Sequence, residues 1–233
     1  MDIVIRRPRV LRRPPRPAFV AGPGGGHRRL TVLDPLDART YERLVARVAP
    51  AVERALGHHV VANRVVGSDL RLEDWRIAHR RWRRATGRSE PGGLRLHLDV
   101  ADCYGSIRPE VVDASLRSLG SEPSLELLRL LRELAEQDVP GLPVGPDASA
   151  VLANAVLRPM DLAVRAAGAA HVRWVDDVVV VVRSRRHAIR VLDGVRRELA
   201  SLGLTLQDAK TCLVEDPRDA PSLAVSSPQR RVR

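Results

Sequence analysis

A pair of aspartates followed by five consecutive valines constrains the fold of this 233-residue chain more than any other feature. The valines, residues 178–182, form an unbroken β-branched run, which is typical of a β-strand. Residues 171–182 are therefore predicted to form two strands joined by a short turn over residues 175–177. That turn carries both carboxylates, Asp176 and Asp177.

A third carboxylate follows another predicted strand. Leu94, Leu96 and Leu98 alternate with polar residues and predict a strand with one buried face, so that Asp99 emerges on the face opposite the leucines. An antiparallel arrangement places the end of this strand beside the 175–177 turn. The carboxylates then crowd one edge of the sheet, which costs several kcal/mol unless their pKa values rise or cations offset the repulsion.

This acidic cluster has two interpretations. Two Mg²⁺ ions about 3.5–4 Å apart, held by such carboxylates, can activate a 3′-hydroxyl and stabilise a leaving pyrophosphate. Alternatively, the Asp-Asp pair serves turn formation alone, because aspartate is favoured in turns for its local hydrogen bonds. The residues by themselves leave both interpretations open.

The order of predicted elements from residue 94 onward indicates the fold class. It is strand, helix, helix, loop, helix, strand, strand, helix, strand, which is typical of an α+β fold with a ferredoxin-like split βαβ antiparallel sheet and helices on one face. The elements expected are helices over residues 109–119, 125–135, 149–166 and 184–202, a loop over 139–148 and a short strand over 204–206. Two earlier helices are expected over residues 37–56, with a kink near Pro50, and over residues 69–85.

Composition argues against several classes of protein. No apolar run approaches the roughly 18–20 residues that span a bilayer, and the start has no signal-peptide hydrophobic region. Two cysteines cannot form a disulfide framework, so we expect a reducing cytoplasm. The three Trp, two Tyr and one Phe are too few for a stacking-rich RNA-binding surface. A membrane protein, a secreted mini-domain and a zinc finger are therefore disfavoured.

The formal net charge of +11 is unevenly distributed and divides the chain. Residues 1–30, rich in Arg, Pro and Gly, carry +7 and are predicted to be a disordered basic tail, as are residues 218–233, which carry +3. Residues 31–90 carry +4, whereas the centre, residues 91–217, carries −3. Basic arms suit a polyanion, and a solvated tail without a partner is the alternative.

One face of the helix expected over residues 69–85 is basic. Trp75, Ala78, Trp82 and Ala85 fall together on one side at about 100° per residue and are predicted to face the core. The opposite side carries the arginines that are candidates for nucleic-acid binding, Arg76, Arg80, Arg83 and Arg84. A solvated basic face is the alternative.

Four segments carry a further pattern. Residues 98–107 have the sequence LDVADCYGSI, residues 141–154 GLPVGPDASAVLAN, residues 173–177 RWVDD, and residues 202–206 LGLTL, with Lys210-Thr211 shortly after. These segments resemble, in order and spacing, four motifs of the reverse transcriptase family, the RNA-directed DNA polymerases. The resemblance implies a polymerase palm over residues 91–217, preceded by a small helical fingers-like segment over residues 31–90.

The resemblance also implies the roles of individual residues. Asp99 and Asp176 would be the principal ligands of two Mg²⁺ ions, with Asp177 and Val100 assisting and Mn²⁺ as a substitute. Lys210, the one lysine of the chain, would lie near the triphosphate as proton donor or charge stabiliser. Residues implied to contact the nucleotide are Val100, Tyr104, Pro143, Gly145 and Ser149, and residues implied to contact nucleic acid are Asn154 and Trp174.

Three of these positions keep structural alternatives. Tyr104, five residues after Asp99, matches the ring that excludes a 2′-hydroxyl and selects deoxynucleotides, but an aromatic residue also packs at a strand end. Ser149 is equally suited to cap the N-terminus of a helix. Lys210 is equally suited to the surface after a strand.

Several positions depart from the family pattern. Val144 stands where a glutamine is common, Ala150 where a proline is common, and Trp174 where the hairpin usually has a tyrosine. The loop sequence is closer to the abortive-infection and unclassified bacterial reverse transcriptases. Only 22 residues follow Thr211, which predicts that the chain has no complete thumb. The basic residues that hold the triphosphate are expected at Arg64 or among the arginines of residues 76–84.

Two functional hypotheses follow. The first is a bacterial cytoplasmic RNA-directed DNA polymerase that uses an RNA template, a DNA primer and dNTPs, in phage defence or a mobile element, with a separate thumb-like partner. The second is a palm-derived scaffold that binds RNA or a protein and catalyses nothing. RNA affinity that survives loss of Asp176 and Asp177, without nucleotide incorporation, favours the second.

Overall fold

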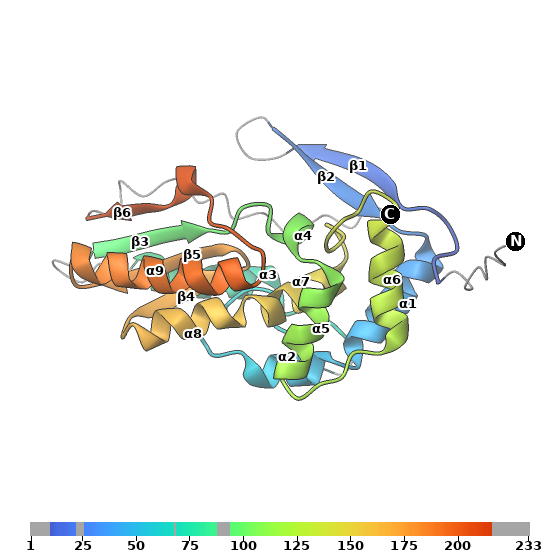
Figure 1. Ribbon diagram of the computed structural model, residues 1–233, viewed down its shortest axis with the longest axis horizontal. Helices are drawn as coiled ribbons and strands as arrows, with labels where there is room; N and C mark the ends of the chain where they lie inside the picture. The colour runs from blue at the N-terminus through green and yellow to red at the C-terminus, as the bar shows by residue number, and fades with distance from the viewer. Residues whose placement is uncertain (1–9, 22–25, 68, 88–93, 216–233) are drawn as a thin grey trace, which may run out of the picture.

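The computed structural model describes residues 10–21, 26–67, 69–87 and 94–215, and a four-stranded antiparallel sheet is its central element (Figure 1). The strands lie in the order β4-β5-β3-β6, with β3 at Leu94–Asp99, β4 at Ala170–Trp174, β5 at Asp177–Val182 and β6 at Cys212–Val214. The predicted hairpin over residues 171–182 is confirmed. The α+β class and the palm-like sheet expected from the sequence are also confirmed.

The register of the sheet fixes which residues meet across it. β3 pairs with β5 from Leu94 opposite Val182 to Asp99 opposite Asp177, and it pairs with β6 along its other edge. The expected short strand over residues 204–206 is replaced by β6, and Leu206 forms only an isolated bridge. The end of β3 therefore lies beside the hairpin turn, as the antiparallel arrangement predicts.

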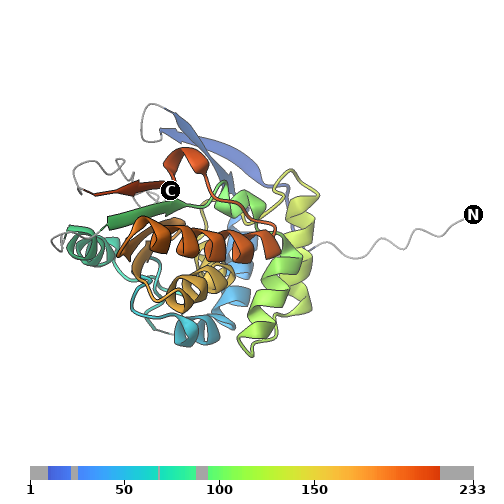
Figure 2. The same ribbon diagram turned by 60° about the vertical axis from the view of Figure 1, so that its left-hand side comes forward.

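One face of the sheet is covered by a pair of helices. α8 (Arg158–Ala166) and α9 (Arg185–Ser201) pack against each other and on the sheet (Figure 2). Val178 and Val180 of β5 and Leu96 of β3 join the helices in one hydrophobic core. The alternate leucines of β3 lie on this face of the sheet and point toward the helices.

The opposite face is covered as well, so the expectation of helices on one face only is wrong. α3 (Trp75–Gly87) packs on β4 through a second apolar cluster that includes Trp82, Trp174 and Val179. Arg95 lies on this face of β3 and is buried, and its guanidinium donates to a carbonyl near the end of α3. The prediction of one buried face for β3 is wrong, because Arg95 and His97 on its other face are buried as well.

A layer of helices lies beyond one end of the sheet (Figure 1). At its centre is α7 (Asp147–Val156), which is buried along almost its whole length. α7 packs against α1 (Pro35–Ala46), α2 (Ala49–Ala55) and α5 (Pro109–Ser118), and α6 (Leu125–Ala135) packs on α1 and α5.

Prolines divide two of the expected helices, one where a kink near Pro50 is predicted and one that the periodicity predicts as continuous. The helix expected over residues 149–166 is divided into α7 and α8, with Pro159 in the first turn of α8. The helix expected over residues 37–56 is divided into α1 and α2, with Pro50 in the first turn of α2. Proline lacks the N–H that a continuous helix needs, but its fixed φ suits a first turn.

The described N-terminal residues form a hairpin where the sequence predicts a disordered tail over residues 1–30. β1 (Arg16–Ala21) pairs antiparallel with β2 (His27–Val32) (Figure 1). Most of its side chains are exposed, which agrees with a composition that has little apolar surface to bury. Residues 1–9 and the tail expected over residues 218–233 lie outside the described residues.

Carboxylates attach the chain before this hairpin to the helical layer. Glu133 accepts hydrogen bonds from the N–H groups of Val10 and Leu11 at 2.9 Å, and Asp37 accepts one from Arg12 at 3.0 Å. Order in this segment thus comes from backbone donors and acidic side chains, which a composition-based prediction cannot detect. In the described part of the chain, no helix is long and apolar enough to cross a membrane.

Candidate active site at the end of the β3–β5 pair

Three carboxylates meet where β3 ends and β5 begins. Asp99 is the last residue of β3 and Asp177 the first of β5, and the two are register partners. Asp176 directly precedes Asp177 in the hairpin turn, whose other residue, Val175, has a left-handed φ of 55°. The structure therefore brings together all of the aspartates that the sequence predicts as metal ligands.

Burial and mutual repulsion make this cluster costly in its ionised form. Burial, followed by the charge of Asp99, raises the pKa of Asp176 to about 6. Burial and the neighbouring Asp176 also raise the pKa of Asp177, which is in hydrogen-bonding contact with Asp99. An all-oxygen donor set with raised pKa values fits Mg²⁺, because a bound divalent cation would stabilise the charged carboxylates.

The ammonium group of Lys210 lies beside the acidic cluster. Its Nζ lies 2.8 Å from Oδ2 of Asp99, and this hydrogen bond raises the pKa of the ammonium group. The side chain is 56% exposed, so the ion pair is screened and available for exchange with another anion. The structure places Lys210 beside the acids, and its expected position near a triphosphate stays a prediction.

The backbone after β3 is held next to Lys210. Ala101 N–H donates to the Thr205 carbonyl at 2.9 Å, and Gln207 N–H donates to the Asp99 carbonyl at 2.8 Å. Val100 lies between these two bonds, and neither of them uses its carbonyl. The Val100 side chain is buried, so any contact with a metal or nucleotide would use its backbone oxygen.

Tyr104 and the predicted nucleotide loop pack against each other. Tyr104 belongs to the short helix α4 (Cys103–Ser106), and its carbonyl accepts a hydrogen bond from Leu142 N–H at 2.8 Å. A Cβ on Gly141 would collide with this carbonyl and lie 2.5 Å from the Gly105 oxygen. Gly141 therefore permits a close backbone approach that places the loop beside Tyr104.

The other loop residues that the sequence predicts for the nucleotide occupy different environments. Pro143 is buried, whereas Gly145 is half-buried and has a φ of 137°, which side-chain-bearing residues rarely adopt. Ser149 is fully buried inside α7, where its hydroxyl lies 3.1 Å from that of Tyr41. The predicted N-cap role of Ser149 is wrong because α7 begins at Asp147, and its buried hydroxyl faces α1 rather than a ligand.

Arg28 on the exposed hairpin strand β2 lies near enough for its charge to act on the site, which the sequence does not reveal. Burial raises the pKa of Tyr104 and Asp176 overall, but the positive charge of Arg28 acts against the increase at both residues. The hairpin is attached to the nucleotide loop, because Thr31 N–H donates to the Val144 carbonyl at 2.7 Å. No motif marks Arg28, so only the arrangement of the hairpin identifies it.

Arg64, the residue expected to hold a triphosphate, is engaged elsewhere. Its guanidinium forms an ion pair with Glu53 at 2.5 Å and donates to the carbonyls of Gly57 and Val60. The remaining expected residues, Arg76, Arg80, Arg83 and Arg84, are exposed on α3, which packs on β4. Arg28 is therefore the better placed candidate.

Two residues predicted to contact nucleic acid lie in the interior. Asn154 is 1% exposed, and its side chain bridges the Ala62 carbonyl and the guanidinium of Arg173. Trp174 is 5% exposed and packs against Trp82 of α3. Neither side chain is available to a primer or template. Asn154 is held in the interior by its hydrogen bonds, and alternation along β4 directs Trp174 into the second core.

Comparison with known proteins agrees with this geometry. The sequence matches the family described as reverse transcriptase (RNA-dependent DNA polymerase) over residues 23–226, which is most of its length. The chain belongs to the reverse transcriptase family. A search of curated protein sequences gives no match.

Solved structures with the same fold include two structures of a telomerase. Apo telomerase from Candida tropicalis aligns with 94% of this reverse transcriptase chain at 12% identity, with a TM-score of 0.57 over 47% of its own length. The same telomerase truncated from its C-terminal domain aligns with 89% of the chain at 14% identity, with a TM-score of 0.55 over 51% of its own length. The chain thus spans about half the length of these telomerases, and at this identity the similarity concerns the fold.

The close approach at Gly141 predicts a specific stability defect. Gly141→Ala is expected to lower the free energy of unfolding by about 1–3 kcal/mol, because the added methyl meets backbone atoms that cannot rotate away. Urea denaturation measures the change. Gly87→Ala is the matched control, since a Cβ there meets nothing within 4 Å, and equal stabilities for the two variants would contradict the prediction.

The raised pKa of Asp177 predicts that removing its carboxylate charge stabilises the protein. Asp177→Asn is expected to raise the free energy of unfolding of the metal-free protein by about 1–2 kcal/mol at pH 8. A carboxyl with a raised folded-state pKa stabilises the fold at low pH and loses that contribution as the pH rises, so the gain should shrink toward pH 4. Urea denaturation in EDTA, with the exposed Asp193→Asn as control, tests this. A destabilised Asp177→Asn protein at pH 8 would contradict it.

Proposed function

We propose that this reverse transcriptase family member is an RNA-directed DNA polymerase that transfers nucleotides from dNTPs to a primer 3′-hydroxyl. The observation that carries the proposal is the register pairing of Asp99 with Asp177 beside Asp176, with Lys210 at 2.8 Å from Asp99. This arrangement collects the acidic ligands and one cation at a single edge of a palm-like sheet. The family match over residues 23–226 supports the same chemistry.

Two divalent cations fit the oxygen donors at this edge. Asp99 and Asp176 would be the main ligands, with Asp177 and the Val100 carbonyl beside them, and either Mg²⁺ or Mn²⁺ suits such a set. When bound, such ions supply activation of the primer hydroxyl and stabilisation of the leaving pyrophosphate. The protein contributes by holding its carboxylates together in the register that the sheet imposes.

Two cationic side chains would bind the triphosphate from opposite sides of the site. Lys210 would exchange its ion pair with Asp99 for a phosphate oxygen, and there it can stabilise charge or give a proton to pyrophosphate. Arg28 would reach the same ligand from the β1–β2 hairpin. The ring of Tyr104 would exclude a ribonucleotide 2′-hydroxyl, and Gly145 would allow a close approach of the backbone.

Template and primer would be bound by surfaces that remain predictions. The exposed arginines of α3 and the basic ends of the sequence suit RNA, whose phosphates release counterions on binding. A separate thumb-like partner would grip the duplex product, and a role in phage defence or a mobile element in the bacterial cytoplasm is part of the same proposal.

Nucleotide incorporation tests the proposal directly. Purified protein with an RNA template, a DNA primer, dNTPs and either Mg²⁺ or Mn²⁺ is expected to extend the primer. The double variant Asp176→Ala/Asp177→Ala should lose at least about 100-fold in rate, because the site then retains one of its carboxylates. Asp193→Asn, an exposed acid on α9, should keep wild-type activity.

The second candidate function is an RNA-binding scaffold without catalysis. The observation that favours it is the exposed basic face of α3, which lies on the opposite side of the sheet from α8 and α9. It predicts RNA affinity that is equal in the wild type and in Asp176→Ala/Asp177→Ala, with no incorporation by either. That pair of results would replace the polymerase proposal.

The hairpin arginine gives a separate prediction for the nucleotide. Arg28→Ala should raise KM for dNTP about tenfold and change kcat less, because a charge-assisted bond to phosphate is lost. Arg29→Ala is the matched control, since neighbouring residues of a strand point to opposite faces. Steady-state kinetics with a fixed primer-template distinguishes the two, and equal KM values would contradict the role of Arg28.

A further inference from the structure

The guanidinium of Arg173 connects the hairpin turn to the helical layer. Arg173 is fully buried on β4, three residues before Asp176. One of its terminal nitrogens donates to the Val175 carbonyl at 2.9 Å and to Oδ1 of Asn154 on α7, also at 2.9 Å. A single side chain thus holds the turn that carries the carboxylates against the most buried helix of the fold.

Asp161 on α8 compensates the buried charge of Arg173. The guanidinium donates from Nε to Oδ1 at 2.9 Å and from its other terminal nitrogen to Oδ2 at 2.8 Å, a two-point geometry that fixes its plane. Burial alone would raise the pKa of Asp161, but Arg173 and the hydrogen bonds from His171 and His59 hold it well below its usual value. Asp161 and Arg173 are therefore both ionised. Hydrogen bonds to Asp161 on one side and to Asn154 and Val175 on the other fix the orientation of the guanidinium.

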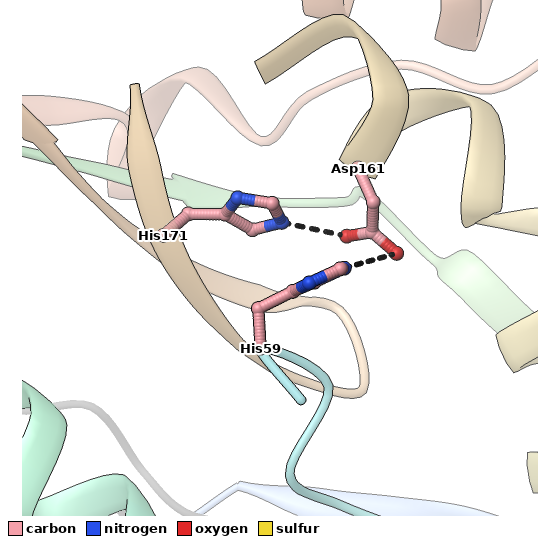
Figure 3. Close-up of side chains that lie close together, drawn as sticks. All are labelled: His59, Asp161 and His171. Carbon is pink, nitrogen blue, oxygen red and sulfur yellow. Dashed lines mark hydrogen bonds and ion pairs between the residues drawn. The ribbon is translucent and has the colours of Figure 1, made fainter. Parts of the chain in front are cut away.

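Two histidines complete the environment of Asp161 (Figure 3). Nε2 of His171 lies 3.1 Å from Oδ1, and Nε2 of His59 lies 3.6 Å from Oδ2. These three side chains could also surround a metal ion, since their ligand atoms lie within 4.8 Å of one another. However, both oxygens of Asp161 already accept from Arg173, and burial lowers the pKa of His171, so a neutral His171 that donates to the carboxylate explains the cluster better than a metal ion does.

The turn needs such support because of its backbone. Val175 has a φ of 55°, which is costly for a β-branched residue and persists only where the surroundings enforce it. The carbonyl that Arg173 binds belongs to the peptide between Val175 and Asp176, so this bond also orients the start of Asp176. The interaction therefore acts on the position of a carboxylate that it does not touch.

We propose that Arg173, oriented by Asp161, is a positioning residue that holds the 175–176 turn in the conformation that directs Asp176 and Asp177 toward Asp99. The inference rests on the proposed function, in which these carboxylates bind the metal ions. It assigns to the buried pair an effect on metal affinity and turnover that packing alone would not produce.

A double variant that removes both charges together tests the proposal in the full chain. Asp161→Asn/Arg173→Gln leaves no unpaired buried charge, and the shorter glutamine side chain cannot reach the Val175 carbonyl. We expect cooperative unfolding, a Kd for Mn²⁺ at least about tenfold higher by electron paramagnetic resonance of the free ion, and a kcat at least about tenfold lower. His171→Gln, which loses a contact with Asp161 but none with the turn, should keep the wild-type Kd.

A rescue variant separates positioning from stability. Val175→Gly added to the double variant should recover part of the Mn²⁺ affinity, because glycine adopts a left-handed φ without strain. A purely structural role for the pair predicts no such recovery. If the double variant fails to fold, Arg173→Lys provides the same affinity measurement, since lysine keeps the charge but lacks the two-point fork.

The results that would overturn the proposal are distinct from failure of the polymerase function. Wild-type Mn²⁺ affinity and kcat in a folded Asp161→Asn/Arg173→Gln or Arg173→Lys protein would remove the positioning role, even in an active polymerase. Absence of incorporation by the wild type would remove the polymerase function, and the Mn²⁺ comparison would still decide whether the pair positions the carboxylates.

Discussion

Like charges at one edge of a sheet are the constraint on which the rest of this structure depends. The β3–β5 register forces Asp99 and Asp177 together, and the turn adds Asp176. Burial raises the pKa of Asp176 and Asp177, so the metal-free fold carries an unfavourable repulsion at the edge where divalent cations would remove it. Val178, Val180 and Val182 of β5 offset this cost, because their buried side chains join β5 to the core beneath α9.

A second charged cluster lies where β4 of the same hairpin packs on α8, and there the charges compensate each other. Arg173 and Asp161 are almost fully buried, but each is matched by a partner of opposite charge and by further hydrogen bonds. The acidic cluster is compensated only in part, by Lys210, at the edge where a ligand can complete it, and the other cluster is compensated within the protein. The hairpin thereby combines an acidic end with a rigid base, as a preorganised site requires.

The sheet and the acidic cluster could be predicted from the sequence because they depend on local patterns. The valine run, the alternating leucines and chain order determine two strands and bring Asp99 to the turn. The β1–β2 hairpin and Arg28 could not be predicted, since their placement depends on hydrogen bonds between distant residues, such as Thr31 to Val144. The sequence likewise predicts the buried side of α3, but not that this side covers the second face of the sheet.

The family motifs predict which segments meet at the site, but they do not predict the directions of the side chains. The segment over residues 141–154 begins at Gly141, where the backbone approaches Tyr104, and ends at Asn154, whose side chain binds Arg173. Its first half lies beside Tyr104, and its second half, as α7, binds the guanidinium that donates to the Val175 carbonyl of the turn. A motif of this kind combines residues that face a ligand with residues that hold the scaffold, and only burial and hydrogen bonding separate the two.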